Sequence, residues 1–224
     1  MVKPCQGRGK IMKKYFYIAV LALYLLLSQF FGQSTGIEKV TPPDSFTNSS
    51  EKKSSNEPDV CLSVEERKLL NLINQYRASK KLPAISASKS LTFVAQTHAR
   101  DSQNNSPDKG NCNLHSWSGK GTWTSCCYTS DHRRAKCMWD KPRELTNYKG
   151  NGFEISSGAS GFNMNAEAAL KSWKGSSGHN NVIISHGMWK NPPWKAIGVG
   201  IYGGYAHVWF GHAADKEGNP ENCK

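Results

Sequence analysis

The sequence predicts an α+β protein in which helices and strands mix without a regular βαβ alternation. Three observations support this prediction: three stretches with apolar residues at helical spacing, two β-rich runs on either side of Gly203-Gly204, and six cysteines between Cys61 and Cys223. Helices and an antiparallel hairpin in one chain favour a layered α-β-α arrangement. An even number of cysteines favours disulfide bonds that staple the layers together.

The first 34 residues are predicted to be a secretory signal peptide that is not part of the fold. Five basic residues precede an apolar run from Tyr15 to Leu27, and Gly32 or Ser34 could lie at a cleavage site. The run is shorter than the ~20 residues that a spanning helix needs, and an uncleaved anchor is the alternative. We therefore expect a secreted protein, extracellular or periplasmic, with no stable membrane span once the signal is removed.

Residues 35–60 are predicted to form a disordered linker, because they are rich in Ser, Pro, Asn and Lys and carry little apolar surface. The folded domain then spans residues 61–224, which is long enough for one core. The leader holds five of the 29 basic residues and none of the 17 acidic ones, so the remaining chain has a formal charge of +7. This excess is scattered, and we expect no nucleic-acid partner.

The predicted domain contains six cysteines, namely Cys61, Cys112, Cys126, Cys127, Cys137 and Cys223. Behind a signal peptide, an even number of cysteines predicts disulfides formed in an oxidising compartment. The first and the last cysteine bracket the domain, and we expect them to pair. The two adjacent cysteines are expected to find separate partners in the remaining pair. A zinc site built from cysteines is disfavoured, because the domain has no CxxC pair.

Two helices are predicted in the first part of the domain. Ser63 and Glu66 form the capping pattern S-x-x-E, and an apolar face behind them extends to about Ser79. A second helix is predicted to begin near Ser88. Its apolar stripe includes His98, which we interpret as a partly buried histidine with a structural role.

A third helix is predicted over Asn165–Trp173, where Asn165 can cap the first turn and the apolar residues share one face. Gly175 and Gly178 are expected to stop this helix and to turn the chain sharply. His179 follows at once. We therefore expect a histidine held on a tight turn and aimed into a cleft, with an ordinary surface-turn histidine as the alternative.

The C-terminal part predicts an antiparallel hairpin. The runs Ala196–Tyr202 and Tyr205–Gly211 flank a Gly-Gly pair, which favours a tight turn. Alternation along the second run places Tyr205, His207 and Trp209 on one face. The glycines of the first run are expected to let a neighbouring element pack closely against it.

The middle of the domain predicts one short strand and a long insertion. GFEIS, around Glu154, has the pattern of a strand that enters a Gly/Ser-rich loop. Residues 104–150 show weak periodicity and hold four of the six cysteines, so we expect a loop-rich, disulfide-stapled insertion. The numerous loop tryptophans are expected to pack mainly as core, with an apolar surface for a lipid or glycan as the alternative.

Taken together, these segments resemble the CAP superfamily, also called the SCP or Tpx/antigen 5/pathogenesis-related family of cysteine-rich secretory proteins. LLNLINQYRASKKLPAIS and LTFVAQTHARD resemble its first two helices, NLHSWS carries its histidine, and GFEIS resembles its G-E-N-I element. WKGSSGHNNVI resembles the W-x-x-S-x-G-H-x-x-N-I form of bacterial members. The resemblance covers about residues 62–212. It implies a three-layer α-β-α sandwich with a central antiparallel sheet.

The resemblance also implies a large cleft lined by two histidines and two acidic residues. The matching positions are His115, Glu154 and His179, while Ser176 stands where many eukaryotic members carry the second acid. Two imidazoles and a carboxylate are a reasonable set for a divalent metal such as zinc, with His115 and His179 as its ligands. Alternatively, Glu154 hydrogen-bonds both histidines and stiffens the cleft. We favour a structural or weakly metal-binding role over catalysis.

We therefore favour a secreted, non-enzymatic CAP-domain protein that binds a partner or a small apolar ligand, lipid-like or sterol-like as the resemblance implies. A metal-assisted extracellular hydrolase or peptidase is the first alternative. Ser176 or Ser177 beside His179 suggests a serine-using variant, but no G-x-S-x-G elbow is present. A toxin or adhesion module that uses the Cys-rich insertion is the second alternative.

Overall fold

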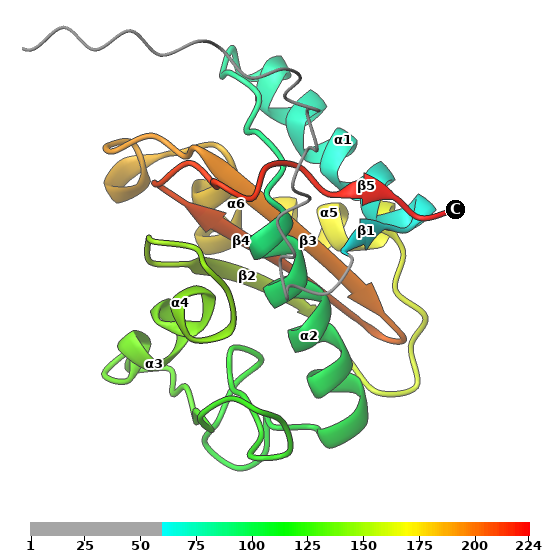
Figure 1. The fold of residues 1–224 in the computed structure, drawn as a ribbon, viewed down its shortest axis with the longest axis vertical. Helices are drawn as coiled ribbons and strands as arrows, with labels where there is room; N and C mark the ends of the chain where they lie inside the picture. Colours follow the sequence, from blue (N-terminus) through cyan, green and yellow to red (C-terminus); the bar gives the residue numbers. More distant parts are fainter. Residues whose placement is uncertain (1–59) are drawn as a thin grey trace, which may run out of the picture. The chain divides into compact units, whose positions relative to one another are not determined.

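The computed structural model describes residues 60–224, and the predicted signal peptide and all of the predicted linker except Val60 lie outside the described residues. Within this part, no helix is long and apolar enough to cross a membrane. The elements along the chain (Figure 1) are β1 (Cys61–Leu62), α1 (Val64–Ser79), α2 (Lys89–Asn105), α3 (Ala135–Trp139), α4 (Lys141–Leu145), β2 (Phe153–Gly158), α5 (Ala166–Gly175), α6 (Ser177–Ile183), the 3-10 helix η1 (Gly187–Trp189), β3 (Ala196–Tyr202), β4 (Tyr205–Gly211) and β5 (Glu221–Asn222).

The central sheet has three antiparallel strands in the order β2-β4-β3. The predicted hairpin joins β3 to β4, and Gly203 in its turn has a φ of +55°, a left-handed conformation that glycine adopts without strain. The predicted GFEIS strand is β2, which pairs with the other side of β4. A separate parallel pair, β1 with β5, brings the two ends of the described domain side by side (Figure 1).

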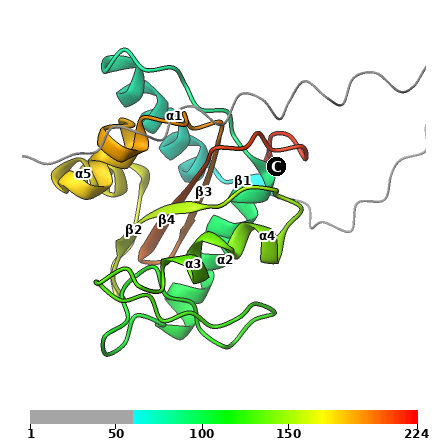
Figure 2. The same cartoon turned by 90° about the vertical axis from the view of Figure 1, so that its left-hand side faces the viewer.

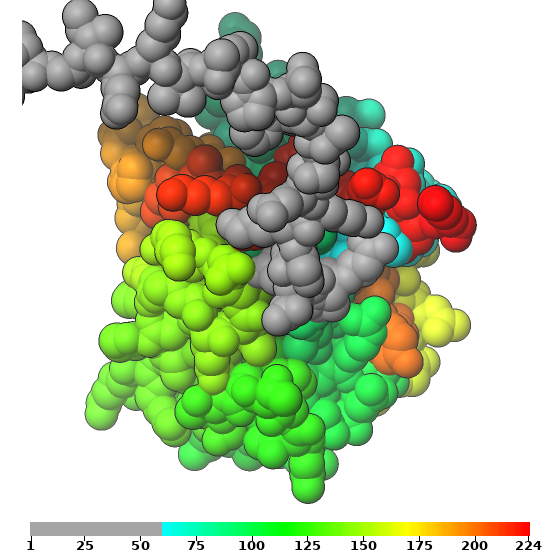
Figure 3. All heavy atoms as spheres, in the orientation of Figure 1, coloured from blue at the N-terminus to red at the C-terminus, as the bar shows by residue number. Residues whose placement is uncertain are grey.

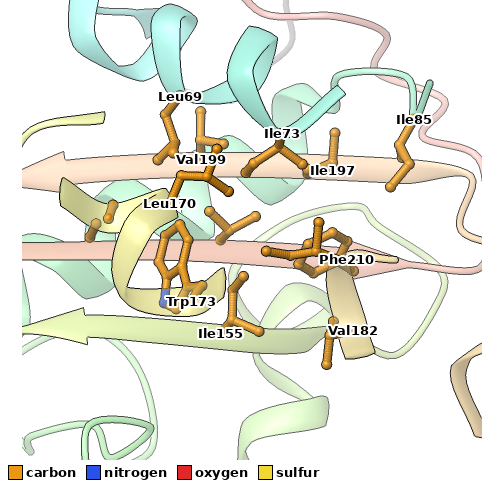
Figure 4. Packing of buried hydrophobic residues seen from close by; sticks show 14 of the residues in the cluster. Leu69, Ile73, Ile85, Ile155, Leu170, Trp173, Val182, Ile197, Val199 and Phe210 are labelled. Carbon is orange, nitrogen blue, oxygen red and sulfur yellow. The ribbon is translucent and has the colours of Figure 1, made fainter. Parts of the chain in front are cut away.

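Helices cover both faces of the sheet, so the predicted α-β-α sandwich is confirmed (Figure 2). On one face α1, α5 and α6 enclose the larger core, where Leu170 and Trp173 pack over Ile155 of β2 (Figure 4). On the other face α2 and the insertion that carries α3 and α4 enclose a second core around Trp117 and Trp209. Alternation along β4 directs successive side chains into these two cores.

The close packing predicted for the first hairpin strand is also confirmed, and its neighbour is α2. A Cβ atom at Gly198 would lie 2.1 Å from the carbonyl carbon of Leu91, and one at Gly200 would lie 2.3 Å from that of Ala95. Only glycine allows the backbones of β3 and α2 to approach this closely. This contact fixes α2 against β3.

Three disulfides link parts of the described domain. They include the predicted pair of the first and last cysteine, and the two adjacent cysteines take separate partners as expected. Cys61 pairs with Cys223, Cys112 with Cys127, and Cys126 with Cys137. The insertion is less irregular than predicted, because it forms the short helices α3 and α4. Its buried apolar side chains include Tyr128, Met138 and Tyr148, and Trp117 is only 2% exposed.

The expectation of a sharp turn at His179 is wrong. Only Ser176, with φ −107° and ψ 116°, interrupts the helical conformation, and α6 begins at the next residue. Gly178 lies inside this short helix, and neither Gly175 nor Gly178 has a positive φ. The apolar end of α6 is buried in the larger core, and this burial outweighs the low helix propensity of glycine.

Candidate functional site

A single buried carboxylate lies at the centre of the candidate site. Glu154 is on β2, where alternation turns it away from the larger core and towards α2 and the insertion. Its Oε1 atom accepts hydrogen bonds from Nδ1 of His98 at 2.6 Å and Nδ1 of His207 at 2.9 Å. Its Oε2 atom accepts one from Nδ1 of His115 at 2.8 Å. The Glu154 side chain is completely buried, so these three histidines replace its hydration.

His98, from α2, carries the charge that balances Glu154. Its Nε2 atom lies 2.8 Å from the carbonyl oxygen of Ser116, so both ring nitrogens face oxygens that can only accept. His98 therefore holds both protons and forms an ion pair with the carboxylate. Burial would raise the pKa of Glu154, but the charge on His98 and the hydrogen bonds from His115 and His207 outweigh it and hold that pKa well below 4.5.

His207, in the middle of β4, is neutral. Burial lowers its pKa from 6.5 to about 4, and the positive charge of His98 adds to this effect. Nδ1 therefore donates to Glu154, while Nε2 accepts from the hydroxyl of Ser102 at 3.1 Å. The hydroxyl of Ser156 lies 3.0 Å from the same Nδ1 atom. His207 thus links the carboxylate to α2.

The insertion supplies the remaining partners of this cluster. Trp117 stacks on His98, with ring centroids 4.1 Å apart and planes 11° from parallel. His115 lies in the loop closed by the Cys112–Cys127 disulfide, and its ring contacts Tyr128 at a centroid distance of 5.2 Å. The His115 side chain is 18% exposed, and Nε2 has no hydrogen-bond partner among residues 60–224. This nitrogen is the part of the cluster that is open to a ligand.

His179, on α6, is half-buried and does not join the hydrogen-bonded cluster. Burial lowers the pKa of His179, and His115 (lowering) and Glu154 (raising) also act on it electrostatically. Its ring makes no hydrogen bond in the described part of the chain. Ser176 separates α5 from α6, and its hydroxyl bonds to none of the predicted site residues.

The sequence comparison places this arrangement in a known family. Residues 70–210 match the model of the family described as "CAP: Cysteine-rich secretory protein family". The chain belongs to the CAP family. A comparison with curated proteins gave no match.

Several solved structures are similar to this CAP protein. An extracellular SCP-domain protein from Bacillus anthracis is 17% identical with a TM-score of 0.44, over 65% of this chain and 39% of that one. A cysteine-rich secretory protein from Staphylococcus aureus is 15% identical with a TM-score of 0.43, over 66% and 38%. An outer surface protein from Borrelia burgdorferi is 15% identical with a TM-score of 0.43, over 66% and 91%. The match spans less than half of the first two proteins.

The CAP protein's own residues offer two places for a metal. The first is the group of His98, Glu154 and His207, whose possible ligand atoms all lie within 4.8 Å of one another among the described residues. The Nδ1 atoms of both histidines already bond to the carboxylate, so a metal would have to displace a buried ion pair. His115 fits better, because a histidine that donates Nδ1–H to a carboxylate presents Nε2 to a metal. This fit concerns His115, with Glu154 behind it, and its pairing with His179 stays a prediction.

The sequence analysis did not identify two members of the cluster as site residues. His98 was expected to be partly buried and structural, but it is fully buried and bonded to Glu154. His207 was assigned only to a strand face. The available signals were the four-residue spacing of His98 and Ser102 on one helix stripe and the presence of His207 beside Trp209 on the same strand face. Neither pattern identifies a partner in another element.

Proposed function

We propose that this CAP protein acts outside the cell as a binding protein, not as an enzyme, and that it takes a partner or a small apolar ligand beside His115 and His179. The observation that carries the proposal is the enclosure of Glu154. Both carboxylate oxygens accept hydrogen bonds from histidines, and the side chain is completely buried. A carboxylate with a strongly lowered pKa and no open oxygen is a poor general base or nucleophile.

The serines near the cluster do not form a usable nucleophile. In a Ser-His-acid triad, the serine and the acid bind opposite nitrogens of the imidazole. Ser156 approaches the same Nδ1 atom of His115 as Glu154 does. Ser102 does lie opposite Glu154 across His207, but Ser102 and His207 are no more than 1% exposed, so a substrate has no access.

The neutral and aromatic rings at His115 and His179 suit an apolar ligand with one polar group. Burial lowers the pKa of His179, so its ring is neutral at physiological pH. Tyr128 adds an aromatic ring beside His115, and burial raises the pKa of its phenol. Three disulfides in the described domain support an extracellular location, since such bonds persist in oxidising compartments.

The proposal is tested by native mass spectrometry of the secreted chain incubated with a sterol and with a long-chain fatty acid. We expect one lipid to be retained, and the complex to weaken on His179→Ala but not on Lys109→Ala, which changes an exposed side chain. Absence of retention by the parent protein would contradict binding. Peptide turnover that disappears with His179→Ala would instead identify an enzyme.

A divalent metal site at His115 and His179 is a second candidate, favoured by the Glu154–His115 hydrogen bond of 2.8 Å. Bound zinc would supply a Lewis acid there. Zinc titration followed by calorimetry should show weak binding that His115→Ala abolishes and His186→Ala leaves intact. Equal zinc binding by both variants would exclude this site.

A further inference from the structure

A second surface feature lies outside the histidine cluster, in residues 186–195, which we call the 186–195 loop. The loop contains η1 and presents Met188, whose side chain is 80% exposed. No other large hydrophobic side chain in the described part is as exposed. Transfer of an exposed methionine side chain from water to an apolar environment is favourable, so Met188 can contribute to binding at an apolar surface.

The base of the 186–195 loop consists of packed aromatic rings. Trp189 contacts Phe153 at a centroid distance of 5.4 Å and Trp194 at 5.6 Å. Trp194 is 6% exposed, and its indole N–H donates to the carbonyl of Val182 at 2.9 Å. His212 stacks on Trp194 at 4.2 Å with planes 8° from parallel. The exposed methionine therefore stands on a fixed aromatic base.

The sequence on both sides of this loop carries charge of one sign. Residues 168–214 contain four lysines and no aspartate or glutamate. Lys190 and Lys195 belong to the loop itself, both are exposed, and neither takes part in an ion pair within residues 60–224. Lysines without ion-pair partners beside an apolar side chain are complementary to a surface that has an apolar interior and anionic groups on its outside.

We propose that the 186–195 loop docks this protein on an anionic lipid surface. Met188 would enter the boundary between headgroups and acyl chains, Trp189 would lie at headgroup level, and the two lysines would contact anionic headgroups. The geometry favours a bilayer over a protein partner, because a stable protein interface buries about 800 Å² on each side, whereas this loop offers one projecting side chain. The surface is separate from His115 and His179.

The experiment is cosedimentation of the secreted chain with vesicles of phosphatidylcholine alone and of phosphatidylcholine with phosphatidylglycerol. We expect binding to the anionic vesicles that weakens with added salt, since salt screens exposed charges. Met188→Ser should lower the partition coefficient about tenfold, the factor expected for losing one buried methionine side chain. Lys190→Glu with Lys195→Glu should remove the preference for anionic vesicles.

Matched control variants distinguish binding by this loop from nonspecific adsorption to the vesicles. Any contribution of the leader is the same in every variant. Val64→Ser changes a side chain that is 78% exposed, and Lys109→Glu with Lys120→Glu reverses two exposed lysines elsewhere. Both controls should bind as the parent protein does. Equal binding of the parent to both vesicle types, or equal losses in the control and loop variants, would overturn the proposal.

Discussion

The carboxylate of Glu154 and the imidazole of His98 form a completely buried ion pair, with Oε1 and Nδ1 2.6 Å apart. The other ring nitrogen of His98 binds the carbonyl of Ser116 in the insertion. The pair therefore joins three parts of the domain: strand β2, helix α2 and the disulfide-stapled insertion. A pair in this position stabilises the fold only as long as both members are present, because either one alone would be an uncompensated buried charge.

Replacing the acid tests this dependence. Glu154→Gln keeps the volume but leaves His98 without a counter-charge, and we expect the free energy of unfolding to fall by about 3–5 kcal/mol. Urea denaturation followed by tryptophan fluorescence measures it. The control is Glu167→Gln, which removes an exposed partner of Lys68 and should cost at most about 1 kcal/mol. Similar small losses in both variants would show that the buried pair is not a stabilising element.

Acid should destabilise the folded domain. The pKa of His207 is lowered from 6.5 to about 4, and that of Glu154 lies well below 4.5, so both groups hold fewer protons in the folded than in the unfolded state. The His207 contribution is complete above about pH 6.5 and is lost as the pH falls towards about 4, whereas the Glu154 contribution is lost only below about pH 4.5. We expect the free energy of unfolding in urea to decrease by a few kcal/mol over this range.

The matching variant for the pH experiment is His207→Gln, which removes the titrating ring. Its free energy of unfolding should depend less on pH between about 6.5 and 4.5 than that of the parent protein. His186→Gln changes an exposed histidine and should follow the parent curve. A stability that is constant down to about pH 4 would contradict the lowered pKa of His207.

A methyl group at the contact between β3 and α2 should be poorly tolerated. Gly198→Ala would place its Cβ atom 2.1 Å from backbone atoms of Leu91, which cannot move without shifting the helix. We expect a loss of about 1–3 kcal/mol or more in the free energy of unfolding. Gly178→Ala in α6, where the added Cβ meets nothing within 4 Å, should be neutral or stabilising by up to about 1 kcal/mol. Thermal unfolding of both variants would refute the prediction if Gly198→Ala were the more stable.

Opening the Cys112–Cys127 disulfide should loosen the candidate site. The bond closes a loop of 15 residues that carries His115 and Trp117, and its removal by paired serine substitutions should cost about 3 kcal/mol in the chain-entropy model. The His115 imidazole signals should also broaden in NMR spectra, since the loop no longer holds that ring against Glu154. Unchanged stability together with sharp His115 signals would mean that packing of the insertion alone positions His115.

Local signals in the sequence predicted most of the elements correctly. Ser63 and Glu66 form the expected capping box, Ser88 caps α2, and Asn165 caps α5. Each signal depends on side chains within four residues of the backbone groups that they satisfy, so it can be recognised without the fold. The same local reasoning was wrong at Gly178, where burial of the following apolar residues in the core keeps the chain helical.

Local sequence signals could not predict the histidine cluster. His98 and His207 are 109 residues apart in the chain, but their rings lie 4.1 Å from each other and both contact Glu154. Their partnership depends on the register between β2 and β4 and on the close approach of α2 to β3 at two glycines. Neither the strand register nor the approach of the helix can be predicted from a short stretch of sequence.

By itself, the sequence determined the layered fold class, the capped helices, the hairpin, the pairing of the first and last cysteine and the resemblance that the CAP family match confirmed. These properties follow from residue types and short spacings. Only the tertiary structure decided the state of the site: which histidines hold Glu154, which of them is charged, and which nitrogen stays open. The reason is physical, because burial and neighbouring charges set protonation and hydrogen bonding, and both arise when distant segments pack together.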